Sequence, residues 1–325
     1  MTPERFSPVL TATLWMLAAG CSSPHPSSTE HAPIAAANAT ELGDHYWGIA
    51  CLSVASARAL PDHKAELGTQ VWMGGVVQAL KCTTNNLWYF VKTAEGYSAW
   101  LEKGTFVRCT PEEAAAWTNA PLLVVTALED VIRQQPDPGA EPVSDVVVAD
   151  LVKPMSARGE WVQVELPDGR SGFIPANSVE DYGQWRAKRE PTADNIERTG
   201  RRLIGRPYLW GGDSPKGLDC SGFTRLVFYL NGVELPHNAA LQSRQGAPVP
   251  LDDTLSQLRK GDLLFFGRPE RGGQPERILH VGIFLGDKLF IQASERVQIS
   301  SLDPASPIRD EHRIRTLLRA RRVLK

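Results

Sequence analysis

A cysteine and a histidine sixty residues apart carry the side chains that nucleophilic catalysis requires. Cys220 follows Asp219 and the glycines at 211–212, and it precedes apolar residues at helical spacing. We therefore expect Cys220 in the first turn of an amphipathic helix, a position that favours a thiolate. His280 lies in the apolar run 279–285, which predicts a strand. The pair could act as nucleophile and base.

A third group must orient the imidazole, and strand register indicates Gln292. In an alternating strand His280 shares a face with Gly282. If the turn that follows has three residues, 286–288, Gly282 lies opposite Gln292, whose amide oxygen can accept the imidazole N–H. A two-residue turn would instead place Gln292 on the wrong face. The prediction therefore depends on the length of this turn.

The residues after 190 are expected to form an α+β domain that positions these groups. Helices are predicted at 194–205 and 221–230, and strands at 262–266, 279–285, 289–293 and 297–300. A helix that carries the nucleophile would pack on an antiparallel sheet that carries the base.

Two upstream segments, 48–120 and 121–183, show short alternating runs separated by turns, which predict two small β-barrels. Both contain a strand with a tryptophan, a glycine turn and a strand that ends in an aromatic residue. The aromatic pairs are Trp88 with Trp100 and Trp161 with Phe173. Their equal spacing indicates a degenerate repeat.

The N-terminus is expected to be a targeting segment. Residues 1–21 resemble a bacterial lipoprotein signal, with Arg5 in a polar start, an apolar run at 9–19 and Cys21 as the lipidated first residue of the mature chain. Residues 22–47 are expected to be a flexible tether. The protein would then be lipid-anchored in the cell envelope, facing the periplasm, and would meet the membrane only through that anchor. An ordinary cleaved secretory signal is the alternative.

Charge and cysteine usage narrow the partners. A formal net charge of -2 gives no electrostatic case for nucleic acid or for an anionic membrane surface. Export permits disulfides, and Cys82 and Cys109 fall at comparable places in predicted strands, so we expect a bridge between them and a free, buried Cys51. No Cys or His spacing typical of a metal site is present, and neither a metal nor another cofactor is expected.

The C-terminal motifs resemble the NlpC-type family of papain-like cell-wall cysteine peptidases. The resemblance rests on five blocks, which occur in order within residues 190–325: 208–212, 218–223, 260–263, 280–283 and 290–294. The two upstream segments resemble bacterial SH3-like domains. The implied architecture is α+β, a papain-like catalytic domain preceded by two small SH3-like β-barrels. Gln292 departs from the histidine usual at the third position, although papain-like enzymes also use a side-chain amide there.

The resemblance implies a role for each residue of the site. Cys220 would attack the scissile carbonyl, His280 would move the proton and Gln292 would hold the imidazole ring. The hydroxyl of Tyr208 would point toward the sulfur and the oxyanion region. The backbone N–H of Cys220 would donate to the oxyanion.

Members of this family with SH3-like domains cut murein peptides that carry a free L-Ala and release L-Ala-γ-D-Glu. Such a preference needs acceptors for the ammonium group and a wall against longer chains. Asp219 and Ser221 beside the nucleophile, and Glu66 and Tyr97 in the first barrel, are the candidates for binding this substrate. Residues 236–239 depart from the family's usual Arg-Asp-Ser or Arg-Asp-Ala, so any substrate contact from that loop must change.

We therefore expect a cysteine peptidase that hydrolyses the γ-D-glutamyl to L-diamino acid bond of murein peptides with a free N-terminal L-Ala, in cell-wall recycling or remodelling. One alternative is an endopeptidase that acts on intact stem peptides of the sacculus. A second is a wall-binding module whose chemistry has degenerated. Cleavage of a peptide with an N-acetylated L-Ala would favour the first, and binding without turnover would favour the second.

Overall fold

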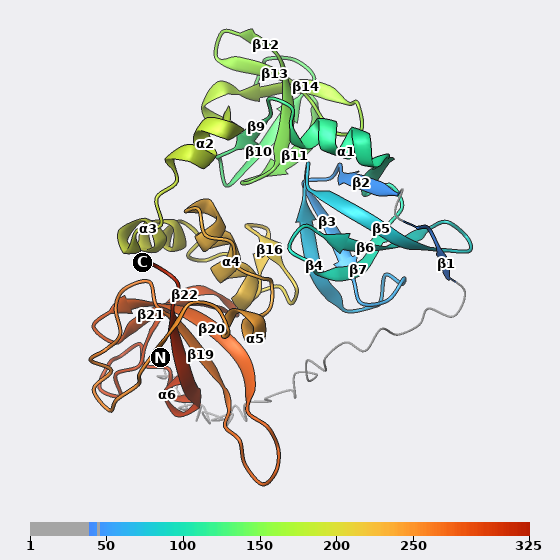
Figure 1. Cartoon of the computed structure of the whole chain (residues 1–325). Coiled ribbons are helices and arrows are strands. Elements are labelled where there is room, and N and C mark those ends of the chain that lie inside the picture. Colours follow the sequence, from blue (N-terminus) through green and yellow to red (C-terminus); the bar gives the residue numbers. More distant parts are fainter. Residues whose placement is uncertain (1–38, 44–45) are drawn as a thin grey trace, which may run out of the picture. The chain divides into compact units, whose positions relative to one another are not determined.

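The computed structural model describes residues 39–43 and 46–325 (Figure 1). The predicted signal with Cys21, and most of the predicted tether, lie outside the described residues. Within that tether, however, β1 (Ala39–Glu41) pairs with β5 (Val76–Thr83), so the first barrel begins before residue 48. No helix of the described part of the chain is long and apolar enough to cross a membrane.

The first barrel is an eight-stranded antiparallel sheet. Its other strands are β2 (Trp47–Ala50), β3 (Val54–Arg58), β4 (Leu67–Trp72), β6 (Trp88–Thr93), β7 (Ser98–Glu102) and β8 (Phe106–Cys109). They lie in the order β4-β3-β7-β6-β5-β2-β8, with β1 beside β5. Alternate residues face inward and form one core, which includes Val77, Val91 and Leu101.

The second barrel repeats this topology strand by strand. Its strands are β9 (Leu123–Val125), β10 (Glu129–Arg133), β11 (Pro142–Val147), β12 (Leu151–Arg158), β13 (Trp161–Glu165), β14 (Ser171–Pro175) and β15 (Val179–Asp181). Their order is β11-β10-β14-β13-β12-β9-β15, so each strand from β2 to β8 has a counterpart seven strands later. The repeat expected from the aromatic spacing is therefore present in the sheets.

The repeat extends to single residues. Arg58 pairs with Trp100 in the first barrel, and Arg133 pairs with Phe173 in the second. Each arginine donates a hydrogen bond of 2.8 Å to the backbone carbonyl seven residues further on. The two barrels thus share this arginine contact as well as their strand order.

A short helix, α1 (Pro111–Thr118), follows the first barrel. In the second barrel the 3-10 helix η1 (Ala176–Ser178) precedes the last strand, β15, and α2 (Tyr182–Lys188) follows that strand. Helix α2 lies in the chain between the second barrel and the C-terminal domain. Its Trp185 is buried, and the ring lies 5.9 Å from that of Tyr229. This stretch is therefore packed against the C-terminal domain.

The C-terminal domain has the expected α+β architecture. Its helices are α3 (Ala193–Arg202), α4 (Cys220–Leu230), α5 (Ala239–Gln242) and α6 (Glu311–Thr316). Its strands are β16 (Asp213–Ser214), β17 (Gly217–Leu218), β18 (Ala247–Val249), β19 (Leu263–Arg268), β20 (Arg277–Gly286), β21 (Leu289–Ser294), β22 (Arg296–Ser301) and β23 (Leu317–Arg322). The main sheet has the antiparallel order β18-β23-β19-β20-β21-β22.

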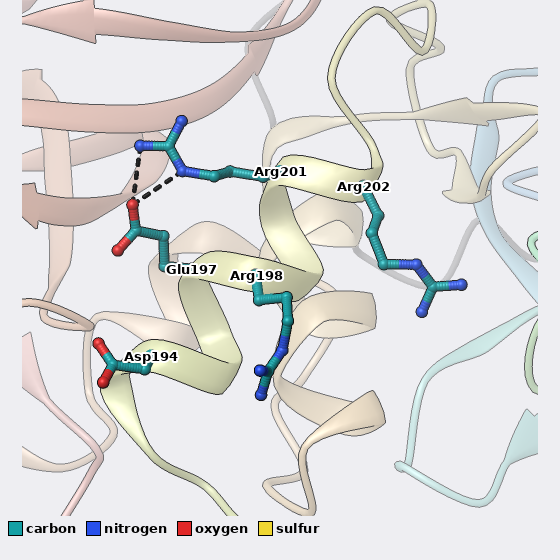
Figure 2. Close-up of a pocket in the computed structure, with 5 residues that line it drawn as sticks. All are labelled: Asp194, Glu197, Arg198, Arg201 and Arg202. Atoms are coloured by element: carbon teal, nitrogen blue, oxygen red, sulfur yellow. Dashed lines mark hydrogen bonds and ion pairs between the residues drawn. The ribbon is translucent and has the colours of Figure 1, made fainter.

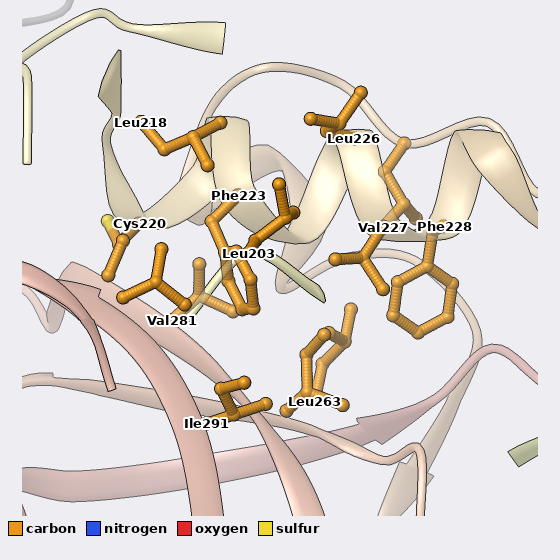
Figure 3. Close-up of a cluster of buried hydrophobic side chains, with 14 of the residues drawn as sticks. Leu203, Leu218, Cys220, Phe223, Leu226, Val227, Phe228, Leu263, Val281 and Ile291 are labelled. Atoms are coloured by element: carbon orange, nitrogen blue, oxygen red, sulfur yellow. The ribbon is translucent and has the colours of Figure 1, made fainter. Parts of the chain in front are cut away.

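Helix α4 begins at Cys220 because Asp219 caps it. The Asp219 carboxylate accepts the Gly222 N–H at 2.7 Å. Phe223 and Val227 are fully buried against the sheet, in the cluster that also contains Cys220 (Figure 3). The core of the domain therefore fixes the position of the thiol.

The first barrel contacts the C-terminal domain through β4. Gln70 Oε1 accepts the backbone N–H of Asp213 at 2.8 Å, and Trp72 Nε1 donates to the Asp213 carbonyl at 2.7 Å. A Cβ added to Gly211 would lie 2.2 Å from the Leu67 carbonyl oxygen, and Gly211 has a φ of +72°. Only glycine satisfies both conditions, so the turn before Cys220 is shaped to accept the barrel.

The expected disulfide is absent, because the two cysteines lie on strands that are not neighbours. Cys51, Cys82, Cys109 and Cys220 are all free among the described residues. Strand β2 lies between β5, which carries Cys82, and β8, which ends at Cys109. Two strand spacings of about 4.8 Å exceed the Cα separation that a disulfide spans. Cys51 is free and buried, as expected.

Candidate active site

Cys220 lies at the first position of α4 with a side chain that is almost completely enclosed; the residue is 8% exposed. Burial and the nearby Asp219 carboxylate raise the pKa of the Cys220 thiol to about 12, while the backbone N–H of Val281 and the charge of Arg313 act in the opposite direction. The expectation that the helix start favours a thiolate was therefore wrong for the free protein. Desolvation outweighs the position at the helix terminus.

The turn after β20 is shorter than the three-residue turn, 286–288, that would place Gln292 opposite Gly282. Gly286 pairs with Leu289, so the turn has two residues, and both, Asp287 and Lys288, have positive φ. Leu285 and Leu289, which would flank a three-residue turn, do not pair. A β-bulge at Leu285 adds one residue and restores the predicted register, in which Ile283 lies opposite Ile291.

Gln292 therefore faces His280, although the turn is shorter than expected. A Cβ added to Gly282 would lie 3.4 Å from Gln292 Cβ, which confirms that these two positions face each other. His280 Nε2 lies 2.7 Å from Gln292 Oε1. Gln292 is fully buried and His280 is 5% exposed.

The imidazole is held in its neutral form. Burial lowers the pKa of His280 well below its ordinary value, the charge of Arg313 lowers it further, and the hydrogen bond to Gln292 opposes the shift. With the raised pKa of Cys220, this gives a resting pair of thiol and neutral imidazole. The Cys220 sulfur accepts a hydrogen bond from the backbone of Val281, the residue next to His280. The two elements thus bring nucleophile and base together.

Tyr208 lies beside the thiol. It is half-buried, and burial together with the proximity of Cys220 and Asp219 raises the pKa of its hydroxyl. Its backbone N–H donates to the Glu295 carbonyl at 2.8 Å, which ties the turn before α4 to the sheet. A role in the oxyanion region stays a prediction.

The Asp219 carboxylate has four partners, unevenly divided between its two oxygens. Oδ1 accepts from the Gly222 N–H, from the Ser221 hydroxyl at 3.0 Å and from His237 Nε2 at 3.2 Å, whereas Oδ2 accepts only the Gly211 N–H at 3.1 Å. Burial would raise the pKa of Asp219, but His237 and the other donors to Oδ1 hold it below its ordinary value. Oδ2 keeps a free acceptor site on a charged group.

The Ser221 side chain and carbonyl both make hydrogen bonds within the protein. Its hydroxyl is buried and donates to Asp219, and its carbonyl accepts from Gln242 Nε2 at 3.0 Å. Ser221 therefore stabilises the helix start, and a contact with substrate stays a prediction.

Glu66 and Tyr97 of the first barrel lie near Trp210 and Asp219 of the C-terminal domain, and their role in binding substrate stays a prediction. Glu66 Oε1 accepts from Trp210 Nε1 at 2.5 Å. A Cβ on Gly68 would lie 2.9 Å from the Tyr97 hydroxyl, so this hydroxyl lies against the start of β4, two residues after Glu66. Burial, Glu66 and Asp219 all raise the pKa of Tyr97, which places two carboxylates and a hydroxyl in one region.

Sequence reasoning missed three residues near the site. His237 is buried and links Asp219 to Thr69 of the first barrel, with His237 Nδ1 2.7 Å from Thr69 Oγ1. Asp310 and Arg313 both contact Gln292. The proline before His237 suggested an exposed turn, and nothing in the spacing of Asp310 and Arg313 relates them to a strand about twenty residues earlier.

Two hollows lie away from the thiol. One, of about 450 Å³, is on helix α3 and is lined by Asp194, Glu197 and three arginines, of which Arg201 is paired with Glu197 (Figure 2). The other, of about 310 Å³, has Trp72, Tyr182 and Tyr229 among its lining residues. Neither includes Cys220 or His280. No group of three or more potential metal-binding side chains occurs among the described residues.

The site holds a buried thiol and a buried, neutral imidazole, and two known families match the chain that carries them. Residues 205–316 match the NlpC/P60 family, and residues 58–104 match the bacterial dipeptidyl-peptidase SH3 domain. The C-terminal domain belongs to the NlpC/P60 family of cysteine peptidases. The NlpC/P60 match includes Cys220, His280, Gln292 and Arg313, and the SH3 match includes Glu66 and Tyr97.

Two relatives match more of this chain than its C-terminal domain alone. The gamma-D-glutamyl-L-lysine dipeptidyl-peptidase of Bacillus cereus is 29% identical over 215 residues, which cover 65% of this chain and 62% of that protein. Dipeptidyl-peptidase 6 of Lysinibacillus sphaericus is 26% identical over 78% of this chain and 91% of its own length. The crystal structure of an NlpC/P60 family protein from Bacillus cereus superposes with a TM-score of 0.71 at 24% identity, covering 86% of this chain and all of that one. The last comparison confirms the fold.

Proposed function

We propose that this NlpC/P60 protein hydrolyses the γ-D-glutamyl to L-diamino acid bond of murein peptides that carry a free N-terminal L-Ala. The observation that carries the proposal is the position of Glu66 and Tyr97 beside Asp219, because together they offer negative charge and a hydroxyl to an ammonium group. Bacillus and Lysinibacillus relatives bear dipeptidyl-peptidase names, which agree with release of a dipeptide.

The proposed reaction uses the side chains of Cys220, His280 and Gln292 and one water molecule. The Cys220 sulfur attacks the γ-carbonyl carbon of D-Glu while its proton passes to Nδ1 of His280, the ring nitrogen that Gln292 leaves free. The tetrahedral intermediate collapses as His280 returns the proton to the departing amine. Water, deprotonated by His280, then hydrolyses the thioester and restores the thiol.

A pair of peptides tests the substrate. Purified protein is incubated with L-Ala-γ-D-Glu-L-Lys and with its N-acetylated form, and products are measured by mass spectrometry. We expect release of L-Ala-γ-D-Glu from the free peptide and a loss of at least about 100-fold in kcat/KM on acetylation, because the acetyl group removes the ammonium charge and meets the wall. Equal cleavage of both peptides would support the endopeptidase instead.

Variants of Glu66 and Tyr97, the residues proposed to bind the ammonium group, refine this test. Glu66→Gln and Tyr97→Phe keep the shape and remove one charge or one hydroxyl. We expect each to lower kcat/KM for the free peptide about 5- to 10-fold, equivalent to about 1 to 1.4 kcal/mol, while the rate on the acetylated peptide stays the same. Cys220→Ala is the control for turnover, since it should bind peptide without cleaving it. Turnover by Cys220→Ala would exclude the cysteine mechanism, and binding without turnover by the wild type would favour the wall-binding module.

We also propose a lipid anchor on Cys21, outside the described residues. Detergent phase partitioning of the protein expressed with its N-terminus tests this. We expect the wild type in the detergent phase and Cys21→Ala in the aqueous phase or uncleaved. A wild type that remains aqueous would favour the ordinary secretory signal.

A further inference from the structure

Helix α6 contacts the buried amide of Gln292 through its capping residue. Asp310 is the N-cap of α6, and its Oδ1 accepts the backbone N–H of Arg313 at 3.0 Å. Its other oxygen, Oδ2, accepts from Gln292 Nε2, also at 3.0 Å. One carboxylate thus caps the helix and binds the side chain next to the proposed base.

Arg313 approaches the same amide from its other end. Its Nε donates to Gln292 Oε1 at 3.2 Å, and its guanidinium lies 5.5 Å from the ring centre of Phe266. The Phe266 ring in turn lies 5.8 Å from that of His280. The arginine side chain is 15% exposed, so packing restricts its position.

These two charged groups leave the Gln292 amide one orientation. A carboxylate only accepts hydrogen bonds and a guanidinium only donates them. The NH₂ group must therefore face Asp310, where Ser300 Oγ also accepts it at 2.9 Å, and the oxygen must face Arg313. A rotation of the amide by half a turn would replace two charge-assisted hydrogen bonds by two repulsive contacts.

The fixed amide determines which nitrogen of His280 carries the proton. Gln292 Oε1 can only accept, and it lies 2.7 Å from His280 Nε2, so Nε2 must carry the hydrogen. The lone pair then resides on Nδ1, where it can take the thiol proton. We propose that Asp310 and Arg313 are positioning residues that orient Gln292 and, through it, set the Nε2–H tautomer of His280.

The effect on catalysis rests on the proposed peptidase function, and a matched pair of variants tests it. Asn is as good a helix cap as Asp, but its side chain has one acceptor oxygen where Asp310 uses two. We expect Asp310→Asn to lower kcat about 10- to 100-fold with KM changed less than about 3-fold. Asp181→Asn, at the cap of α2, makes the same substitution away from the site and should keep wild-type rates. Wild-type kcat in Asp310→Asn would overturn the proposal.

A double-mutant cycle separates positioning from general stability. If Asp310 acts through Gln292, Asp310→Asn should have no further effect on kcat in the Gln292→Ala background. An equal fold-loss in both backgrounds would mean that Asp310 acts through the fold, and the proposal would fail. Arg313→Lys, which keeps the charge and loses the Nε donor, should behave like Asp310→Asn.

A spectroscopic measurement decides the tautomer without any assay of turnover. The ring nitrogens of ¹⁵N-histidine-labelled full-length protein are recorded at pH 7.5, with His280→Ala to assign the signal. We expect the Nε2–H tautomer in the wild type and in Asp181→Asn, and a shift toward Nδ1–H in Asp310→Asn. An Nδ1–H tautomer in the wild type would overturn the proposal even if the enzyme turns over. The Nε2–H tautomer in a protein without peptidase activity would instead count against the proposed function alone.

Discussion

Thr69 Oγ1 of the first barrel lies 2.7 Å from Nδ1 of His237, whose Nε2 lies 3.2 Å from Asp219. Because a carboxylate only accepts, His237 donates from Nε2 and can accept the Thr69 hydroxyl at Nδ1. This chain of contacts connects the barrel that carries Glu66 and Tyr97 to the cap of the nucleophile's helix. Hydrogen bonds therefore join the barrel that carries the proposed peptide-binding residues to the helix that begins at Cys220.

Thr69→Val tests this connection, because valine keeps the volume and removes the hydroxyl. We expect KM for the free peptide to rise several-fold with little change in kcat, since the wall is loosened and the proposed Cys-His-Gln triad is not. Stability should fall by about 1 to 3 kcal/mol, because Thr69 is fully buried and His237 Nδ1 loses its partner. Thr118→Val, in α1, makes the same substitution at an exposed threonine away from the site and should leave KM unchanged. Unchanged KM in Thr69→Val would contradict the connection.

Gln292→Ala should reduce kcat by about 10²- to 10³-fold without abolishing activity, because His280 and Cys220 remain while the imidazole loses its orienting partner. Steady-state kinetics at saturating peptide measure the effect. Gln163→Ala, on β13 of the second barrel, is the matched control and should leave kcat unchanged. An unaltered kcat in Gln292→Ala would remove this residue from the triad.

Alkylation of Cys220 should be slow at neutral pH. Burial and Asp219 raise the pKa of the thiol to about 12, so the reactive thiolate is scarce and its fraction rises about tenfold for each pH unit. The rate of iodoacetamide labelling between pH 7 and 10, followed by mass spectrometry of the Cys220 peptide, measures this. Labelling of Cys220 that is fast and independent of pH from 6 to 8 would show a thiolate-imidazolium pair in the free protein instead.

Two groups should govern the pH dependence of kcat/KM: His280 of the enzyme on the acid side and the α-amino group of the peptide on the alkaline side. His280 acts as a base only when neutral, and its lowered pKa means that protonation begins only well below pH 6.5. We therefore expect no loss of rate on acidification to pH 6.5. On the alkaline side the rate should fall near pH 8, where the α-amino group of the peptide loses the charge that the wall recognises. An acid limb centred at 6.5 or above would contradict the lowered pKa of His280.

The sequence alone determined the parts that depend on local pattern. A glycine turn followed by apolar residues at helical spacing places Cys220 at a helix start. Alternation places His280 and Gly282 on one face of a strand, and the aromatic spacing predicts the repeated barrels. These features follow from helix and strand periodicity, which neighbouring residues set. The family resemblance supplied Glu66 and Tyr97 as candidate substrate-binding residues.

Only the tertiary structure decided the protonation states, the register and the supporting contacts. The bulge at Leu285 offsets a turn one residue shorter than expected, and no local signal announces it. Burial, which depends on the packing of distant segments, reverses the expected thiolate of Cys220. Asp310 and Arg313 reach Gln292 because the chain returns after β22, and such a contact is set by the folded arrangement rather than by spacing in the sequence.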